Sequence, residues 1–214
     1  MMITNRFLIV IFVLCVLSID NVFSQPATVL TKNGNIFSED AAGKQTQLTA
    51  TSKDTMPVLS FDKKYIAFVR KTDGPKNEKN DFDSSQIWLL NLKSRKSYLL
   101  VQSMPDSDIY TSTLRGNFDA LQFSVDEKYL YFLSGAWATS KAVHRVNLYT
   151  RDDEFITEGN SLYVIPTGKN AGCLMVAKHK LKEGGGYSND NWLLTPTGEE
   201  IKDIGLYEKQ MKLQ

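Results

Sequence analysis

Short apolar runs alternate with polar turns along this chain, and one such unit occurs twice. Turns built on Ser-x-Asp, at Ser60–Asp62 and Ser124–Asp126, each separate two apolar runs rich in aromatic and branched residues. Two apolar runs joined by a tight polar turn are typical of a β-hairpin. A further hairpin follows each copy, so the repeat predicts a unit of four short antiparallel strands, which is one blade of a β-propeller.

The second hairpin of this unit recurs four times, at residues 35–48, 87–100, 143–156 and 191–201. The first hairpin is clear at 56–69 and 120–133, and it has a degraded turn within 162–177. In the N-terminal copy only residues 27–30 precede the tight-turn pair Asn33-Gly34, so an inner strand is missing. The predicted fold is therefore all-β, a small propeller of about four four-stranded antiparallel blades.

The chain end offers one way to complete the N-terminal blade. Residues 206–213 carry enough apolar side chains to form the missing strand, which would close a four-bladed ring by pairing the two termini. Closure would remove unpaired strand edges, which favour aggregation. The same residues also fit a short amphipathic helix, so an open partial propeller and pairing with a second chain remain alternatives.

The first residues have the pattern of an export signal. Arg6 precedes an apolar stretch at residues 7–18, and the small residue Ser24 stands at the expected cleavage point. We therefore expect residues 1–24 to be a signal peptide and residues 25–214 to form one propeller domain. The apolar stretch is shorter than the roughly 20 residues of a membrane span, so we expect no membrane insertion after cleavage, with a retained anchor as the alternative.

Charge and cysteine content limit the possible partners and the compartment of the protein. The chain has 25 Lys and Arg residues and 24 Asp and Glu residues, so no general field attracts nucleic acid or anionic lipid. We therefore expect no nucleic-acid partner. After signal removal Cys173 is the only cysteine, so no internal disulfide can form. An exported protein without disulfides is typical of a bacterial periplasm or cell surface.

The repeats resemble the WD-like propeller repeat of TolB-type proteins and of the propeller domain of prolyl oligopeptidase-type enzymes. That pattern reads Pro, two residues, Ser-Pro-Asp-Gly-Lys and then an apolar strand. Residues 57–68 match it, with Phe61 in place of the second Pro and Lys63 in place of Gly. The second copy has Val125 and Glu127 in those places. The resemblance implies a propeller over residues 28–204 and, for the TolB type, a periplasmic location, but it transfers no binding residue.

Catalytic and metal-binding signals are weak. Cys173 with His144 or His179 contains the elements of a thiolate pair, but Cys173 opens an apolar run in which a buried packing role is expected. No Gly-x-Ser-x-Gly motif is present. Asp81 and Asp83 are two residues apart, which is the spacing of oxygen ligands in a calcium-binding loop. The sequence lacks the glycine that such a loop has at its sharp turn and the glutamate that closes it. We expect no catalytic residues, no metal and no cofactor.

The long connections between predicted strands carry the candidate binding residues. Residues 71–85 and 183–190 join corresponding strands of two blades, so both should emerge on one rim of the propeller. Exposed aromatic and arginine side chains on loops are the usual anchors of protein interfaces. The candidate ligand-binding residues are Asp81, Phe82, Asp83, Tyr110, Arg115, Trp137, Tyr187 and Asn189.

The sequence therefore favours an exported, non-enzymatic propeller that binds a protein, peptide or cell-envelope ligand through rim loops. One alternative is a small hydrolase or lyase that uses loop carboxylates such as Asp81 and Asp83. Another is a structural role, with association through strands at the chain ends. The sequence does not identify the ligand or the oligomeric state.

Overall fold

A computed structural model describes residues 26–73, 84–103, 116–136, 140–181 and 185–206. The expected signal peptide and the segment after residue 206 lie outside these ranges. All regular structure in the described ranges is β-strand, so they contain no helix that could cross a bilayer.

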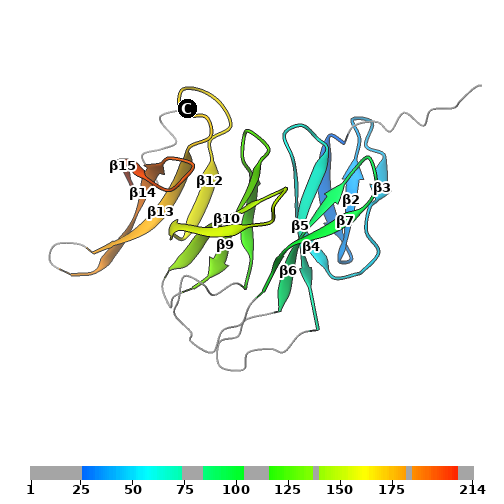
Figure 1. Ribbon diagram of the computed structural model, residues 1–214, viewed down its shortest axis with the longest axis horizontal. Helices are drawn as coiled ribbons and strands as arrows, with labels where there is room; N and C mark the ends of the chain where they lie inside the picture. Colours follow the sequence, from blue (N-terminus) through cyan, green and yellow to red (C-terminus); the bar gives the residue numbers. More distant parts are fainter. Residues whose placement is uncertain (1–25, 74–83, 104–115, 137–139, 182–184, 207–214) are drawn as a thin grey trace, which may run out of the picture.

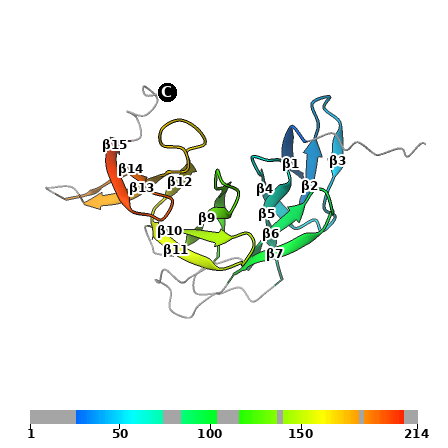
Figure 2. The same ribbon diagram turned by 45° about the horizontal axis from the view of Figure 1, so that its top comes forward.

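The strands of the described residues form four antiparallel sheets set along an arc (Figures 1 and 2). Each sheet is one blade, and its strands follow chain order from the inside of the arc outward. Blade 1 consists of β1 (Thr28–Lys32), β2 (Asn35–Glu39) and β3 (Gln45–Gln47). Blade 2 consists of β4 (Asp54–Leu59), β5 (Tyr65–Lys71), β6 (Ser85–Asn91) and β7 (Ser97–Gln102). Blade 3 consists of β8 (Asp119–Phe123), β9 (Tyr129–Gly135), β10 (Lys141–Asn147) and β11 (Asp153–Glu158). Blade 4 consists of β12 (Ser161–Val164), β13 (Leu174–Leu181), β14 (Tyr187–Leu194) and β15 (Glu200–Leu206).

The architecture confirms the predicted all-β propeller. Blade 1 has three strands among the described residues, whereas the other blades have four. Blades 1 and 4 lie at opposite ends of the arc in both views (Figures 1 and 2). Pairing of the two termini is not shown, because residues 207–214 lie outside the described ranges. Closure of the ring stays a prediction.

Apolar faces of neighbouring blades pack against each other along the inner strands. β4 contacts β1 and β2 of blade 1 and β8 of blade 3, and β8 in turn contacts β12. Each interface buries its own cluster: Ile66 and Phe68 lie between blades 1 and 2, Leu89 and Phe132 between blades 2 and 3, and Leu174 between blades 3 and 4. The core is therefore a series of layers between blades, as expected for radial sheets.

The two Ser-x-Asp turns have the same local structure. The Ser60 hydroxyl donates to the Asp62 carboxylate at 2.8 Å and accepts the backbone N–H groups of Lys64 and Tyr65 at 3.1 and 3.0 Å. The hydroxyl of Ser124 makes the same contacts, at 2.7 Å to Asp126 and at 3.1 and 2.9 Å from the following backbone N–H groups. The repeated motif therefore fixes each hairpin by side-chain to backbone hydrogen bonds.

The connections divide between two rims of the arc. The short-turn rim, at the top of Figure 1, carries the turns that join the first two and the last two strands of the four-stranded blades, such as residues 60–64 and 92–96. The long-loop rim, at the bottom, carries the connections between the two middle strands of the four-stranded blades, the turn between β1 and β2 of blade 1, and the connections between blades. Its two longest connections lie between β5 and β6 and between β7 and β8.

Candidate functional site

The long-loop rim of blade 2 has a paired base beneath the connection from β5 to β6. The backbone N–H of Thr72 donates to the carbonyl of Ser84 at 3.0 Å, and that of Lys71 donates to the carbonyl of Lys53 at 2.9 Å. Lys53 also forms an ion pair with Asp73. The two ends of this long connection are therefore held together by the sheet.

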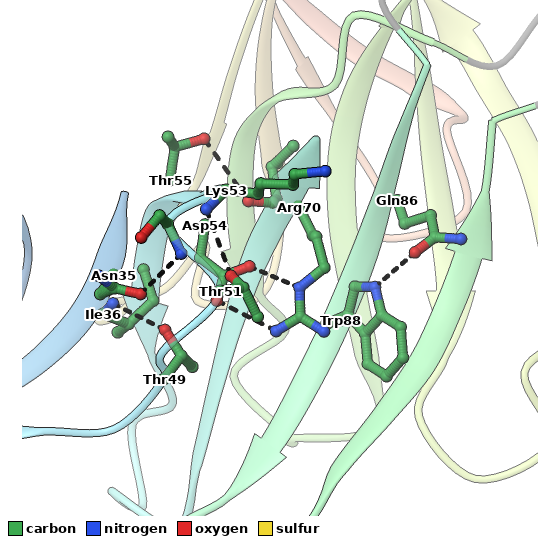
Figure 3. A network of polar contacts seen from close by, with 12 residues as sticks. Asn35, Ile36, Thr49, Thr51, Lys53, Asp54, Thr55, Arg70, Gln86 and Trp88 are labelled. Atoms are coloured by element: carbon green, nitrogen blue, oxygen red, sulfur yellow. Dashed lines mark hydrogen bonds and ion pairs between the residues drawn. The ribbon is translucent and has the colours of Figure 1, made fainter. Parts of the chain in front are cut away.

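A buried ion pair supports this base. Asp54 begins β4 and is fully buried, and its two carboxylate oxygens accept the Nε and Nη2 groups of Arg70 at 2.6 and 3.0 Å (Figure 3). Such a two-point contact fixes the guanidinium in one orientation. The Asp54 carboxylate has no contact with water, and the positive charge of Arg70 offsets the free-energy cost of burying it.

Aromatic rings enclose the same guanidinium. The Cζ atom of Arg70 lies 4.6 Å from the centre of the Trp88 ring and 5.3 Å from that of Phe68. The indole N–H of Trp88 donates to the side-chain oxygen of Gln86 at 2.8 Å (Figure 3). The side-chain amide of Gln86 in turn donates to the side-chain oxygen of Gln102 on β7. All four strands of the blade are therefore tied together next to the long-loop rim.

The connection from blade 1 joins this network. The backbone N–H of Ser52 donates to Asn35 at 2.9 Å, and the backbone N–H of Ile36 donates to the Thr49 hydroxyl at 2.9 Å (Figure 3). Gly34 has φ +69°, and a Cβ atom there would lie 2.3 Å from the carbonyl oxygen of Ser52. Only glycine fits this close approach, so the Asn33-Gly34 turn also sets how blade 1 packs on blade 2.

Blade 3 has a more exposed ion pair at the same rim. The Nζ atom of Lys141 lies 3.0 Å from the carboxylate of Asp119. Partial burial opposes ionisation of Asp119, but the hydrogen bonds from Lys141 and from the Ala120 backbone outweigh it and hold the pKa of this carboxyl below its ordinary value. The carboxylate is therefore charged at neutral pH and already paired.

Blade 4 presents the two described candidates. Tyr187 and Asn189 both lie on β14 where it leaves the long-loop rim, and both are exposed, Tyr187 by 70%. The Tyr187 ring centre lies 5.7 Å from that of His179. The structure therefore places these two candidates at the expected rim, with an aromatic side chain open to solvent.

The other candidates lie outside the described residues: Asp81, Phe82, Asp83, Tyr110, Arg115 and Trp137. The strand ends that flank them all belong to the long-loop rim. Their role stays a prediction. The sequence analysis did not identify the residues that support this rim, Asp54, Arg70 and Trp88. A single sequence does not show which residues on separate strands contact each other.

The described residues do not assemble a catalytic pair. Cys173 is half-buried and lies just before β13, not within it. His179 is roughly 20 Å further along that extended strand. His144 is 1% exposed, so it does not face solvent; it stacks on Phe132 in the interface between blades 2 and 3. Among the described ranges, no group of three His, Cys, Asp or Glu side chains is placed to hold a metal ion.

The amino-acid sequence matches no family model and no curated protein. The fold does match solved structures. TolB from Acinetobacter baumannii superposes with a TM-score of 0.52 at 16% identity, over 81% of this chain and 40% of that chain. The β-propeller domain of the Trilobed protease from Pyrococcus furiosus gives 0.54 at 18% identity, over 83% and 53%. Dipeptidyl peptidase 4 from Porphyromonas gingivalis gives 0.50 at 14% identity, over 82% and 30%.

These similarities establish the fold. The chain spans between 30% and 53% of the length of these three structures. At sequence identities this low, a shared fold does not show a shared activity. One of the three is a peptidase and another is the β-propeller domain of a protease, so the fold occurs in proteins with catalytic chemistry. The chain has the fold of a TolB-like β-propeller, which confirms the resemblance found in its repeats.

Proposed function

We propose that this TolB-like β-propeller is an exported, non-enzymatic protein that binds a protein or peptide ligand through its long-loop rim. The observation that carries the proposal is the difference between the two rims. On the short-turn rim, side chains such as Ser60 and Ser124 fix tight turns, whereas the two longest connections both start from the other rim. Variable loops on a rigid scaffold are the usual place for recognition.

The long-loop rim also has the rigid support that a binding surface needs. The Asp54 and Arg70 pair, enclosed by Trp88, holds the strand ends from which the connection between β5 and β6 leaves. A preorganised base lowers the entropy lost when loops become ordered on a ligand. Export is supported by the apolar stretch at residues 7–18.

A loop-exchange experiment tests the proposal. Purified residues 25–214 are used to recover partners from the native cell envelope, alongside a variant in which residues 74–83 are replaced by a short Gly-Ser linker. The pairing of Thr72 with Ser84 stays in place in that variant. The matched control replaces residues 167–170 on the short-turn rim, where the backbone contacts between Ile165 and Cys173 close the connection.

The proposal expects partners to be lost with the first variant and kept with the second. Equal recovery by both variants, with melting temperatures unchanged, would remove the assignment of binding to the long-loop rim. Turnover of a peptide or glycan substrate by the intact chain, abolished by Asp83→Ala, would replace it with the enzymatic alternative.

A further inference from the structure

The short-turn rim of blades 2 and 3 forms a second surface, which we call the cationic turn surface. It consists of the turns at residues 61–64, 92–96, 125–128 and 148–152, which join the first two and the last two strands of blades 2 and 3. Neighbouring turns are joined directly. The backbone N–H of Leu92 donates to the Lys64 carbonyl at 2.9 Å, and that of Leu148 donates to the Lys128 carbonyl at 2.9 Å. The surface is therefore a continuous part of the scaffold.

The positive charge of this surface lies in the blade 2 turns, which carry Lys63, Lys64, Lys93, Arg95 and Lys96 against the single acidic residue Asp62. The blade 3 turns carry Lys128 and Arg151 together with Asp126, Glu127 and Asp152. Lys64 and Lys128 pair with an aspartate of their own turn, at 2.9 and 3.4 Å. Lys63, Lys93 and Lys96 are exposed and have no ion-pair partner among the residues that the structure describes. Arg95 adds an exposed guanidinium between the last two. The corresponding turn of blade 4 carries acidic residues instead, Glu199 followed by Glu200.

Apolar side chains project within the same surface. Phe61 is 53% exposed and Val125 is 38% exposed, and both occupy the residue after serine in the two repeated turns. The hydrogen bond from the Asp62 backbone to Glu127, at 2.9 Å, places these turns side by side. Exposed apolar side chains surrounded by lysines are typical of surfaces that rest at the level of lipid headgroups.

We propose that the cationic turn surface docks this protein onto an anionic lipid bilayer, with Phe61 and Val125 at headgroup depth. Charge complementarity favours this occupant, because a juxtaposed anionic bilayer attracts the exposed side chains of Lys63, Lys93 and Lys96, and the apolar pair gains contact with the acyl boundary. The docking is peripheral and uses no membrane-spanning element. It turns the opposite, long-loop rim toward the aqueous phase.

Co-sedimentation with lipid vesicles tests the inference on residues 25–214. Vesicles of phosphatidylcholine with added phosphatidylglycerol should bind the protein at low ionic strength, and vesicles of phosphatidylcholine alone should not. Lys93→Ser with Lys96→Ser should lower the partition coefficient about 30-fold, from roughly 1 kcal/mol per cation. Phe61→Ser should lower it about tenfold. The control, Lys32→Ser with Lys202→Ser, removes two exposed lysines that lie outside this surface, and it should change the partition coefficient less than about threefold.

Three results would overturn the inference. One is no sedimentation with the anionic vesicles at low ionic strength. Another is equal loss of binding in the two double variants. The third is binding to soluble heparin that Phe61→Ser leaves unchanged, together with no vesicle binding, which would assign the surface to a soluble polyanion. Urea unfolding of each variant verifies that it is folded.

Discussion

The carboxylate of Glu127 accepts a hydrogen bond from the backbone N–H of Asp62 at 2.9 Å, and this contact joins the first turn of blade 3 to that of blade 2. Glu127 stands at a position where the related repeat pattern has glycine. One side chain thus locks together two turns that the sequence shows only as copies of each other. The inter-blade arrangement therefore depends on this residue as well as on the apolar layers.

Glu127→Gln should fold at least as stably as the parent chain at pH 7. Burial raises the pKa of Glu127 above its ordinary value of 4.5. Its contribution to stability is therefore fully present below about that pH and is lost as the pH rises through the higher folded pKa. Glutamine keeps an acceptor for Asp62 without a charge to desolvate, whereas Glu127→Ala removes the acceptor and should cost about 1 kcal/mol. Urea unfolding at pH values from about 4 to about 8 measures the free energy of unfolding of both variants. A glutamine variant less stable than the alanine variant at pH 7 would contradict this account.

Lys63→Gly should stabilise the protein by about 0.5–1 kcal/mol. Lys63 has φ 57°, in the left-handed region that glycine adopts without steric cost, and its side chain is exposed. Glu127→Gly is the matched comparison, because φ is 58° there but the side chain carries the contact with Asp62. Its gain should be smaller or absent. Thermal unfolding of both variants tests this, and a larger gain at position 127 would go against it.

Arg70→Met should destabilise the fold by about 3–5 kcal/mol, because it leaves the fully buried Asp54 carboxylate without its counter-charge. Adding Asp54→Asn should recover part of this loss, since the buried charge is then removed as well. The coupling between the two substitutions is read from a double-mutant cycle in urea. A loss below about 1 kcal/mol for Arg70→Met would show that the pair does not support the rim.

The features that the sequence predicts well are those that repeat. The turns at Ser60 and Ser124 share one set of hydrogen bonds, and Lys63 and Glu127 both adopt positive φ where the repeat pattern has glycine. The hydrogen bonds of such a turn join residues that are close in the sequence, so the repetition of one sequence segment is enough to identify a blade. The Asn33-Gly34 turn, with positive φ at both residues, is predicted for the same reason.

The ion pair of Asp54 and Arg70, which supports the candidate site, is not marked by any repeated pattern in the sequence. At the spacing that separates Ser60 from Ser124, the counterparts of Asp54 and Arg70 are Phe118 and Ser134, which cannot form an ion pair. The pair is therefore specific to blade 2 and depends on the register between β4 and β5. A cross-strand contact that occurs once leaves no periodic trace, and only the fold brings the two residues together.

Two exposed tyrosines on opposite rims test the central claim most directly. Tyr187 is 70% exposed on the long-loop rim, and Tyr149 is 75% exposed on the short-turn rim. A photo-crosslinking phenylalanine derivative is placed at either position, and the protein is irradiated in its native envelope. The account predicts crosslinks to protein from position 187 and none from position 149. Protein crosslinks from position 149 with none from position 187 would contradict it.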